Sequence, residues 1–324
     1  MSDGTERPGS DSPQGAWERD LVTKLASAAL REQRRARLWG IFFKLLTFVY
    51  LSVFVLAVMD WKVRPDMGGS KKHTAMVELN GVISPGSDAS AEKVTSALQA
   101  AFKDKNTQGV VMRINSPGGS PVQSQTIYDE MRRLRKKYPD IPLYAVVEDI
   151  CASGGYFVAA GADRIYVSKS SIVGSIGVLM NGFGFTGLMD KLGVERRLIT
   201  AGENKGMLDP FSPVNPRDVT HAKEMVNDIH QQFIEVVREG RGKRLKETPD
   251  MFSGLIWTGQ KSIELGLADG LGTLDTVARD VIKAEEIVDF TQKENIAEKF
   301  ARRFGASAAN ALADVLLRSS LGLR

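Results

Sequence analysis

An unbroken apolar run at residues 38–59 constrains the fold of this chain more than any other feature. The run holds 22 residues and one charge, Lys44. At about 1.5 Å per residue, a helix of this length covers the hydrocarbon core of a bilayer. Trp39 and Trp61 stand near its two ends, where interfacial aromatic residues belong. The run therefore predicts a single transmembrane anchor.

Two other origins for such a run are a cleaved signal peptide and a buried core helix. A signal peptide has an apolar stretch of about 7–15 residues and a small-residue cleavage site. This run is longer, and the sequence AVMDWK that ends it is a poor site. A core helix rarely shows so long an apolar run, so we favour the uncleaved anchor.

The charges that flank the run predict its orientation. Residues 18–37 hold six Lys and Arg residues, whereas residues 60–79 hold four. Because positive charge is enriched on the cytoplasmic side, this bias places the N-terminus in the cytoplasm. The rest of the chain is then expected outside the cytoplasmic membrane.

Charge and cysteine content exclude several classes of function. Lys and Arg number 43 against 39 Asp and Glu, a net charge of +4. This small excess is not the basic footprint of a nucleic-acid-binding protein, so no nucleic-acid partner is expected. No metal-ligand spacing is present, and neither a metal nor another cofactor is expected. The single cysteine, Cys151, is either a reactive thiol or a small buried residue, and we favour the second interpretation.

After the anchor the sequence predicts an α/β domain. Residues 60–73 are polar and contain glycine, as in a linker. Beyond them, short apolar runs alternate with helical patterns, which is typical of a largely parallel sheet. Strands are expected at 75–79, 109–114, 143–147, 164–167 and 176–180, and helices at 89–103, 122–137, 154–161, 216–241 and from near Gly259 and Thr273. Residues 296–321 suggest an Ala-rich amphipathic helix that packs on the domain, on another subunit or on the membrane.

A Pro-Gly-Gly turn in residues 115–121 follows one predicted strand and leads into a helix. Paired glycines allow the backbone to turn sharply and expose its N–H groups, which can bind an anion or a developing oxyanion. By itself the signal is weak, because most Pro-Gly-Gly segments are only turns.

A second strand-to-helix junction carries Ser153 in the sequence Cys-Ala-Ser-Gly-Gly-Tyr, residues 151–156. The flanking small residues leave room for a substrate backbone, and the N–H of Gly154 would point at the group that Ser153 attacks. The logic resembles a nucleophile elbow, although the pattern is not G-x-S-x-G. The alternative is that Ser153 only caps the helix.

A serine nucleophile needs a base, and the histidines do not present one. His73 lies in the predicted linker, whereas His221 and His230 fall on one long predicted helix. A lysine is the more suitable base, because burial disfavours its charged form. Lys205, in the segment Ala-Gly-Glu-Asn-Lys-Gly at 201–206, is such a candidate, although most lysines in loops are simply solvated.

Taken together, NSPGGSPV, CASGGYFVAAGADRIYVSKSSIVGSIGV and LITAGENKGMLDPFSP resemble the bacterial SppA-type signal peptide peptidases over roughly residues 74–285. The resemblance implies that Ser153 is the nucleophile and Lys205 the general base. It also implies an oxyanion hole from the N–H groups of Gly119 and Gly154. Gly118 and Ser175 are expected to support this site.

The same resemblance implies an α/β fold of the ClpP/crotonase-like spiral type, with repeated ββα units behind one N-terminal transmembrane helix. It further implies a homo-oligomeric ring in which the dyad can be completed across subunits. The expected substrates are signal-peptide remnants and other hydrophobic peptides at the extracytoplasmic face of a bacterial cytoplasmic membrane. The expected organisation is a cytoplasmic lead (1–37), an anchor (38–59), a linker (60–73), a peptidase domain (74–285) and a helical extension (286–324).

Two other functions compete with peptide hydrolysis. A crotonase-like acyl-CoA enzyme would use paired N–H groups for a thioester enolate, but such enzymes are generally soluble. A non-enzymatic membrane scaffold would depend on oligomerisation and not on the site. The anchor and the Lys205 motif argue against the first, and the intact Ser153 and Lys205 motifs argue against the second.

Overall fold

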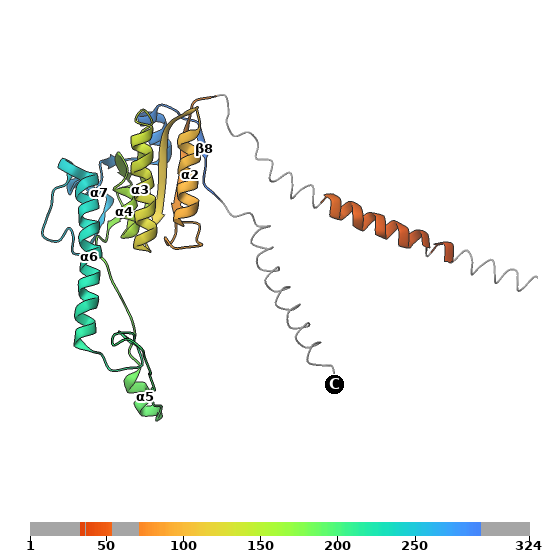
Figure 1. The fold of residues 1–324 in the computed structure, drawn as a ribbon. Coiled ribbons are helices and arrows are strands. Elements are labelled where there is room, and N and C mark those ends of the chain that lie inside the picture. The colour runs from red at the N-terminus through yellow and green to blue at the C-terminus, as the bar shows by residue number, and fades with distance from the viewer. Residues whose placement is uncertain (1–32, 36, 54–70, 293–324) are drawn as a thin grey trace, which may run out of the picture. The chain divides into compact units, whose positions relative to one another are not determined.

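The computed structural model describes residues 33–35, 37–53 and 71–292, and the chain separates into two units, Met1–Asp66 and Met67–Arg324 (Figure 1). In the first unit, Gln33–Val53 forms a helix with a mean hydropathy of 1.4. Within the described residues it is the one helix that is long and apolar enough to cross a membrane, judged by length and composition. The last part of the predicted anchor, residues 54–59, lies outside the described residues.

The second unit is built on an eight-stranded mixed sheet. Its centre consists of three parallel strands, β1 (His73–Asn80), β2 (Thr107–Ser116) and β3 (Leu143–Ala152). The path through the sheet is β6-β5-β3-β2-β1-β8, with β4 and β7 branching from β3. The outer strands are β4 (Arg164–Val167), β5 (Ile172–Gly174), β6 (Ile256–Thr258), β7 (Gly270–Leu271) and β8 (Ile287–Asp289). Among the strands that the structure describes, only β5 and β6 pair in antiparallel fashion.

Helices on one face of the sheet enclose the main core. In Figure 1, α2 (Ala91–Lys103) and α3 (Pro121–Lys137) lie side by side against the strands, and α4 (Gly154–Ala159) follows them. Their buried side chains meet alternate residues of β2, such as Val110, Met112 and Ile114. Because successive strand residues point to opposite faces, this alternation positions the helices on one face.

The opposite face of the sheet carries a smaller apolar cluster. Val111, Val146 and Tyr166 pack there with Val277. Val277 begins the π-helix η2 (Val277–Ile282), which follows the short helix α8 (Leu274–Thr276). The C-terminal part of the described domain therefore covers part of the second face.

Local capping explains where the long helices begin. Ser120 accepts a hydrogen bond from the N–H of Gln123 at the start of α3, and Asn215 accepts one from Arg217 at the start of α6 (Pro216–Arg241). Each cap is followed by a proline, whose missing N–H costs nothing in the first turn of a helix. The predicted helix 216–241 is thereby confirmed.

The structure differs from the predicted elements in several places. His73, expected at the end of a linker, is the buried first residue of β1. Residues 176–180, expected as a strand, are irregular. The preceding residue, Ser175, has φ 51°, which breaks the extended conformation at the end of β5. The helix α5 (Thr186–Leu192), α7 (Gly259–Glu264) and the 3₁₀ turn η1 (Gly242–Arg244) complete the described elements.

Some predicted regions lie outside the described residues. These are residues 1–32 of the cytoplasmic lead, nearly all of the linker and the predicted helix 296–321. The domain boundaries therefore stay predictions.

Candidate active site

Two loops of the candidate site meet because their strands are parallel neighbours. β2 and β3 pair along their length, and Ser116 at the end of β2 lies opposite Cys151. The carboxyl ends of both strands therefore reach the same edge of the sheet. The Pro-Gly-Gly turn and the Ser153 junction both begin at this edge, which is where ligands of open α/β sheets bind.

The backbone of the Pro-Gly-Gly turn depends on glycine. Gly118 and Gly119 have φ values of 96° and 152°. Ile83 pairs with this turn, since its N–H donates to the Gly118 carbonyl (2.9 Å) and its carbonyl accepts from Ser120 (2.8 Å). A Cβ atom on Gly119 would lie 2.1 Å from the Ile83 oxygen. The pairing holds one edge of the turn and leaves the Gly119 N–H directed away from Ile83.

Ser153 occupies a strained position between β3 and α4. Its φ of 52° and ψ of −125° are unusual for a residue with a side chain, and such positions cluster at functional sites. Its N–H donates to the Gly174 carbonyl at 2.8 Å, which fixes the turn. Its hydroxyl makes no capping hydrogen bond to α4. The helix-cap alternative for Ser153 therefore finds no support in the structure.

The two glycine segments pack directly against each other. A Cβ atom on Gly118 would lie 2.5 Å from the Gly154 nitrogen and 2.8 Å from the Ser153 Cβ atom. A Cβ atom on Gly154 would lie 3.2 Å from the Gly119 nitrogen. The backbone N–H groups of Gly119 and Gly154 therefore lie close together beside Ser153, an arrangement that can bind one oxyanion.

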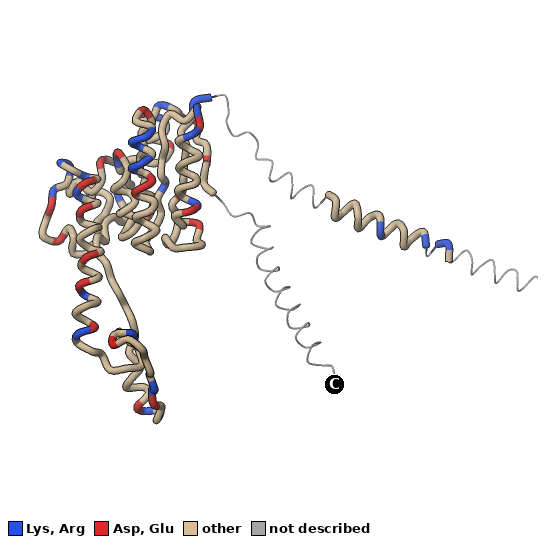
Figure 2. Tube along the Cα trace, viewed as in Figure 1, with Lys and Arg blue, Asp and Glu red and all other residues tan. Residues whose placement is uncertain are grey.

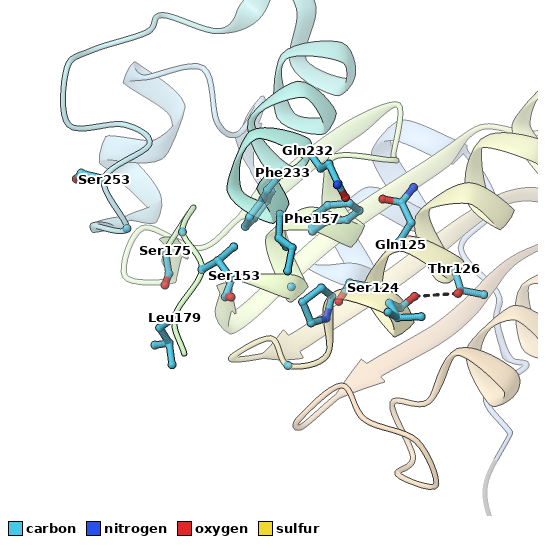
Figure 3. A pocket seen from close by; sticks show the side chains of 18 residues that line it. Ser124, Gln125, Thr126, Ser153, Phe157, Ser175, Leu179, Gln232, Phe233 and Ser253 are labelled. Atoms are coloured by element: carbon cyan, nitrogen blue, oxygen red, sulfur yellow. Dashed lines mark hydrogen bonds between the residues drawn. The ribbon is translucent and has the colours of Figure 1, made fainter. Parts of the chain in front are cut away.

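These residues line a single pocket of about 740 Å³ (Figure 3). Ser153, Gly119, Gly154 and Ser175 all belong to its wall. Its apolar wall comes from α4, α6 and the segment after β5, through Phe157, Phe233, Ile229, Val178 and Leu179. None of the 18 lining residues carries a charge. The pocket therefore suits an uncharged, apolar ligand segment.

Ser175 stands next to the candidate nucleophile. It follows Gly174, whose carbonyl accepts the Ser153 N–H. Its own N–H donates to the Leu255 carbonyl at 2.7 Å, and its φ is 51°. Figure 3 shows its side chain near that of Ser153.

Lys205 does not line the pocket. It lies exposed in a turn, where its N–H donates to the Gly202 carbonyl. This turn belongs to a segment that we call the arm, residues 177–215 between β5 and α6. Figure 1 shows α5, within the arm, beside the end of α6 that is remote from the sheet. Within the described protomer, Ser153 and Lys205 are therefore not brought together.

None of the three histidines lines the pocket either. His73 is buried and stacks on Phe290. His230 places its Nε2 atom 3.2 Å from the Ile176 carbonyl, and His221 is an exposed residue on α6. Nor do the described residues contain a cluster of three His, Cys, Asp or Glu side chains that could hold a metal ion.

Cys151 is fully buried in the main core. Burial raises the pKa of its thiol, because the thiolate loses its hydration. A protonated, inaccessible thiol is a poor nucleophile, so the interpretation as a small buried residue holds.

Sequence reasoning missed the pocket walls. Phe233 and Ile229 fall within the helix predicted for residues 216–241, where an apolar side chain by itself indicates only core packing. Ser124, buried behind Gly154, carried no sequence signal beyond its position in α3. Their shared exposure to one cavity depends on the packing of α3, α4 and α6.

Two family models and several known proteins match parts of this chain. Residues 135–288 match the model of peptidase family S49, and residues 75–173 match that of Clp protease. A protein of Enterococcus faecium named "Putative signal peptide peptidase SppA" is 30% identical, over 69% of this chain and 67% of its own length. Protease 4 of Haemophilus influenzae is 29% identical, over 67% of this chain and 35% of its own length.

A protein of Brucella abortus named Na(+)/H(+) antiporter NhaA is 44% identical over 209 residues. The match covers 63% of this chain but only 28% of that protein. A second relative with this name, from Brucella melitensis, is likewise covered over 28% of its length. The similarity to these two proteins is therefore confined to a fraction of each.

Proposed function

Because this chain belongs to peptidase family S49, with its SppA-type serine proteases, we propose that it is a serine endopeptidase whose nucleophile is Ser153. One observation carries the proposal. Ser153 lies in a strained strand-to-helix turn, beside the adjacent N–H groups of Gly119 and Gly154, in an apolar pocket. This combination supplies a nucleophile, an oxyanion site and a place for a peptide.

In the proposed reaction, a neutral Lys205 amine takes the proton of the Ser153 hydroxyl, and Oγ attacks a peptide carbonyl carbon. The resulting oxyanion accepts hydrogen bonds from Gly119 and Gly154. The C–N bond then breaks, and the lysine returns the proton to the leaving amine. Water hydrolyses the acyl ester by the same route, which releases a carboxylic acid and the free serine.

The position of Lys205 favours completion of the dyad by a neighbouring subunit. The pocket wall of one protomer carries no base, and Lys205 lies exposed on the arm. The arm also exposes large apolar side chains, including Phe183 (82%) and Ile199 (95%). Contact with another copy would bury these side chains together with the lysine, and burial favours the neutral amine that a base requires. We therefore include a homo-oligomeric ring in the proposal.

The apolar walls suit extended hydrophobic peptides as substrates, and signal-peptide remnants are peptides of this kind. Residues 38–59, which begin within the helix Gln33–Val53, are the proposed anchor, with the N-terminus in the cytoplasm and the peptidase domain at the extracytoplasmic face. The match to the Clp protease model supports assignment of the domain to the ClpP/crotonase-like spiral fold.

The test is hydrolysis of a fluorogenic hydrophobic peptide by the full chain in detergent. Ser153→Ala and Lys205→Ala should each reduce turnover to the background rate without changing circular dichroism or assembly. Lys191→Ala, on the same arm and equally exposed, is the matched control and should keep full activity. Retained activity in both dyad variants would refute the proposal.

A mixing experiment distinguishes the two ways of completing the dyad. Co-assembled Ser153→Ala and Lys205→Ala subunits contain pockets with a serine from one copy and a lysine from the other. Recovery of activity on mixing indicates a dyad between subunits. If each variant is inactive alone and the co-assembled mixture is inactive as well, the dyad lies within each subunit.

A further inference from the structure

We propose that the edge of the sheet at which the chain enters β1 binds the headgroups of anionic phospholipids. We call this surface the basic edge. It consists of six exposed lysines: Lys71, Lys72, Lys103, Lys105, Lys136 and Lys137. The proposal rests on the membrane anchoring proposed above, and it concerns a surface remote from the peptidase pocket.

Contacts of the backbone and of aromatic side chains bring together the segments that carry these lysines. Phe102, at the end of α2, stacks on Tyr138, just after α3, with 5.8 Å between ring centroids. The ammonium group of Lys137 lies over the Tyr138 ring at 5.0 Å. The N–H of His73 donates to the Asn106 carbonyl at 3.0 Å, which joins the start of β1 to the loop that carries Lys105.

The charge of this edge contrasts with the balance of the whole domain. Residues 71–292 hold 27 Lys and Arg and 28 Asp and Glu. Figure 2 shows basic residues where the chain enters β1 and along the end of α3. Lys103, Lys105, Lys136 and Lys137 make no ion pair within the described residues. Four carboxylates lie near this edge and are outnumbered by the six lysines. Asp104 is half-buried and accepts a hydrogen bond from the Asn106 N–H, whereas Asp140, Glu285 and Glu286 are exposed.

Helix electrostatics explain only part of the cluster. Lysines in the last turn of a helix interact favourably with its dipole, which accounts for Lys103, Lys136 and Lys137. Lys71, Lys72 and Lys105 lie in connections between elements and have no such role. The helix dipole therefore does not explain why these three lysines lie at the same edge.

The position of the edge in the chain identifies the partner. Lys71 follows the predicted anchor, residues 38–59, after 11 residues, 60–70, which span at most about 40 Å when extended. The edge is therefore tethered near a bilayer surface, where each lysine is attracted to anionic lipid. Among the charged surfaces of the domain, this one is the first that the chain reaches from the membrane.

Docking by this edge would also orient the pocket. Ser153 follows the carboxyl end of β3, at the opposite edge of the sheet. A strand of ten residues is about 33 Å long. The pocket of a docked domain would therefore receive peptides that extend away from the bilayer surface, and not segments still embedded in it.

The test uses the full chain reconstituted into vesicles of phosphatidylcholine alone or with one third phosphatidylglycerol. A water-soluble N-hydroxysuccinimide ester acylates exposed lysines, and mass spectrometry quantifies each site. We expect several-fold less labelling of Lys103, Lys105, Lys136 and Lys137 in the anionic vesicles, with the difference lost at about 0.5 M salt. Lys169, Lys191 and Lys223, exposed elsewhere on the domain, serve as internal controls and should not change.

Equal labelling of the basic edge in both vesicles would overturn the proposal. Equal protection in both would also overturn it, because another copy of the chain would then cover the edge. A second measurement uses amide hydrogen exchange of residues 101–107 and 133–142 in anionic vesicles. Lipid-dependent protection should be lost in Lys103→Gln/Lys136→Gln/Lys137→Gln and kept in Lys169→Gln/Lys191→Gln/Lys223→Gln.

Two parallel measurements separate this proposal from the function on which it rests. Peptidase activity of the same samples tests the dyad, and carbonate extraction tests the anchor. If lipid-dependent protection is seen without peptidase activity, the lipid-binding proposal stands and the peptidase proposal is refuted. If the protein is active and resists carbonate extraction but shows no lipid-dependent protection, only the lipid-binding proposal for the basic edge is refuted.

Discussion

At the scale of single residues, the site depends on backbone conformations that side chains rarely adopt. Ser153 and Ser175 both have φ near 50°, and Gly118 and Gly119 have positive φ as well. A serine at such a φ costs about 1–3 kcal/mol, which the surrounding hydrogen bonds must offset. Two of these hydrogen bonds run from the Ser153 N–H to the Gly174 carbonyl and from the Ser175 N–H to the Leu255 carbonyl. These backbone conformations place both serine side chains at the pocket wall.

Gly154→Ala tests the pair of amides directly. The new methyl group would lie 2.5 Å from the Ser124 Oγ atom and 3.2 Å from the Gly119 nitrogen. We expect kcat to fall by about 10²–10³, as for loss of an oxyanion donor, and stability to fall by about 1–3 kcal/mol. Peptide hydrolysis and urea unfolding measure the two effects.

Ser124→Ala provides the matched control for this clash. The double variant Gly154→Ala/Ser124→Ala removes the contact at 2.5 Å but keeps the methyl group beside the Gly119 N–H. It should regain stability without regaining activity. Full recovery of activity would mean that the single variant acted through packing and not through the amides.

At the scale of elements, a buried ion pair holds the end of α6 against the body of the domain. The Arg241 side chain is fully buried and donates to Asp269 at 2.9 Å, while Arg244 contacts the same carboxylate at 3.1 Å. Burial alone would raise the pKa of Asp269, but its hydrogen bonds and the two guanidinium charges outweigh burial and lower the pKa. The carboxylate also accepts from the Ile165 N–H at the start of β4. Since α6 carries Phe233 into the pocket wall, this ion pair positions the site indirectly.

Asp269→Asn should destabilise the domain by about 3–5 kcal/mol, because it leaves the buried Arg241 without a counter-charge. The control Glu264→Gln breaks an exposed pair with Lys261 and should cost no more than about 1 kcal/mol. Urea unfolding at pH 7 measures both.

The loss of stability caused by Asp269→Asn should depend on pH. The folded state lowers the pKa of Asp269, so its contribution is complete above the ordinary value of 3.8 and is lost as pH falls through the folded value. The stability difference between the wild type and Asp269→Asn should therefore shrink below about pH 4. A difference that stays constant down to pH 2 would exclude the ion pair as its cause.

At the scale of the whole molecule, the arm is incompletely buried within one protomer. Leu179, Phe183, Leu192, Ile199 and Val214 all expose more than half of their surface. Phe185 and Phe211 stack at 5.4 Å, which gives the arm some packing of its own. Exposed apolar surface of this extent is typical of a protein interface. The arm is therefore the surface through which we expect subunits to associate.

Ile199→Glu introduces a charge at the most exposed large apolar position of the arm (95%). Burial of an unpaired carboxylate is unfavourable, so we expect smaller species in sedimentation velocity and loss of peptidase activity, with unchanged circular dichroism. Val281→Glu, exposed on η2 and outside the arm, is the control and should preserve both assembly and activity. An active Ile199→Glu protein of unchanged size would rule out the arm as the interface.

The sequence by itself determined the features that depend on local order along the chain. The caps and prolines at Ser120 and Asn215 mark helix starts, and the short apolar run in β2 marks a buried strand. The motif around Ser153 needed only its neighbours in sequence to indicate a strand-to-helix turn. These features are encoded within a few residues, because capping, periodicity and glycine conformation are local effects.

The tertiary structure alone decided what meets at the pocket. The parallel register of β2 and β3 brings Gly119 beside Gly154, and the packing of α6 adds Phe233 from 79 residues further along the chain. It also determined that Lys205 lies on an exposed arm, remote from the pocket wall of its own protomer. No local propensity encodes these distances, because they arise from contacts between segments far apart in sequence.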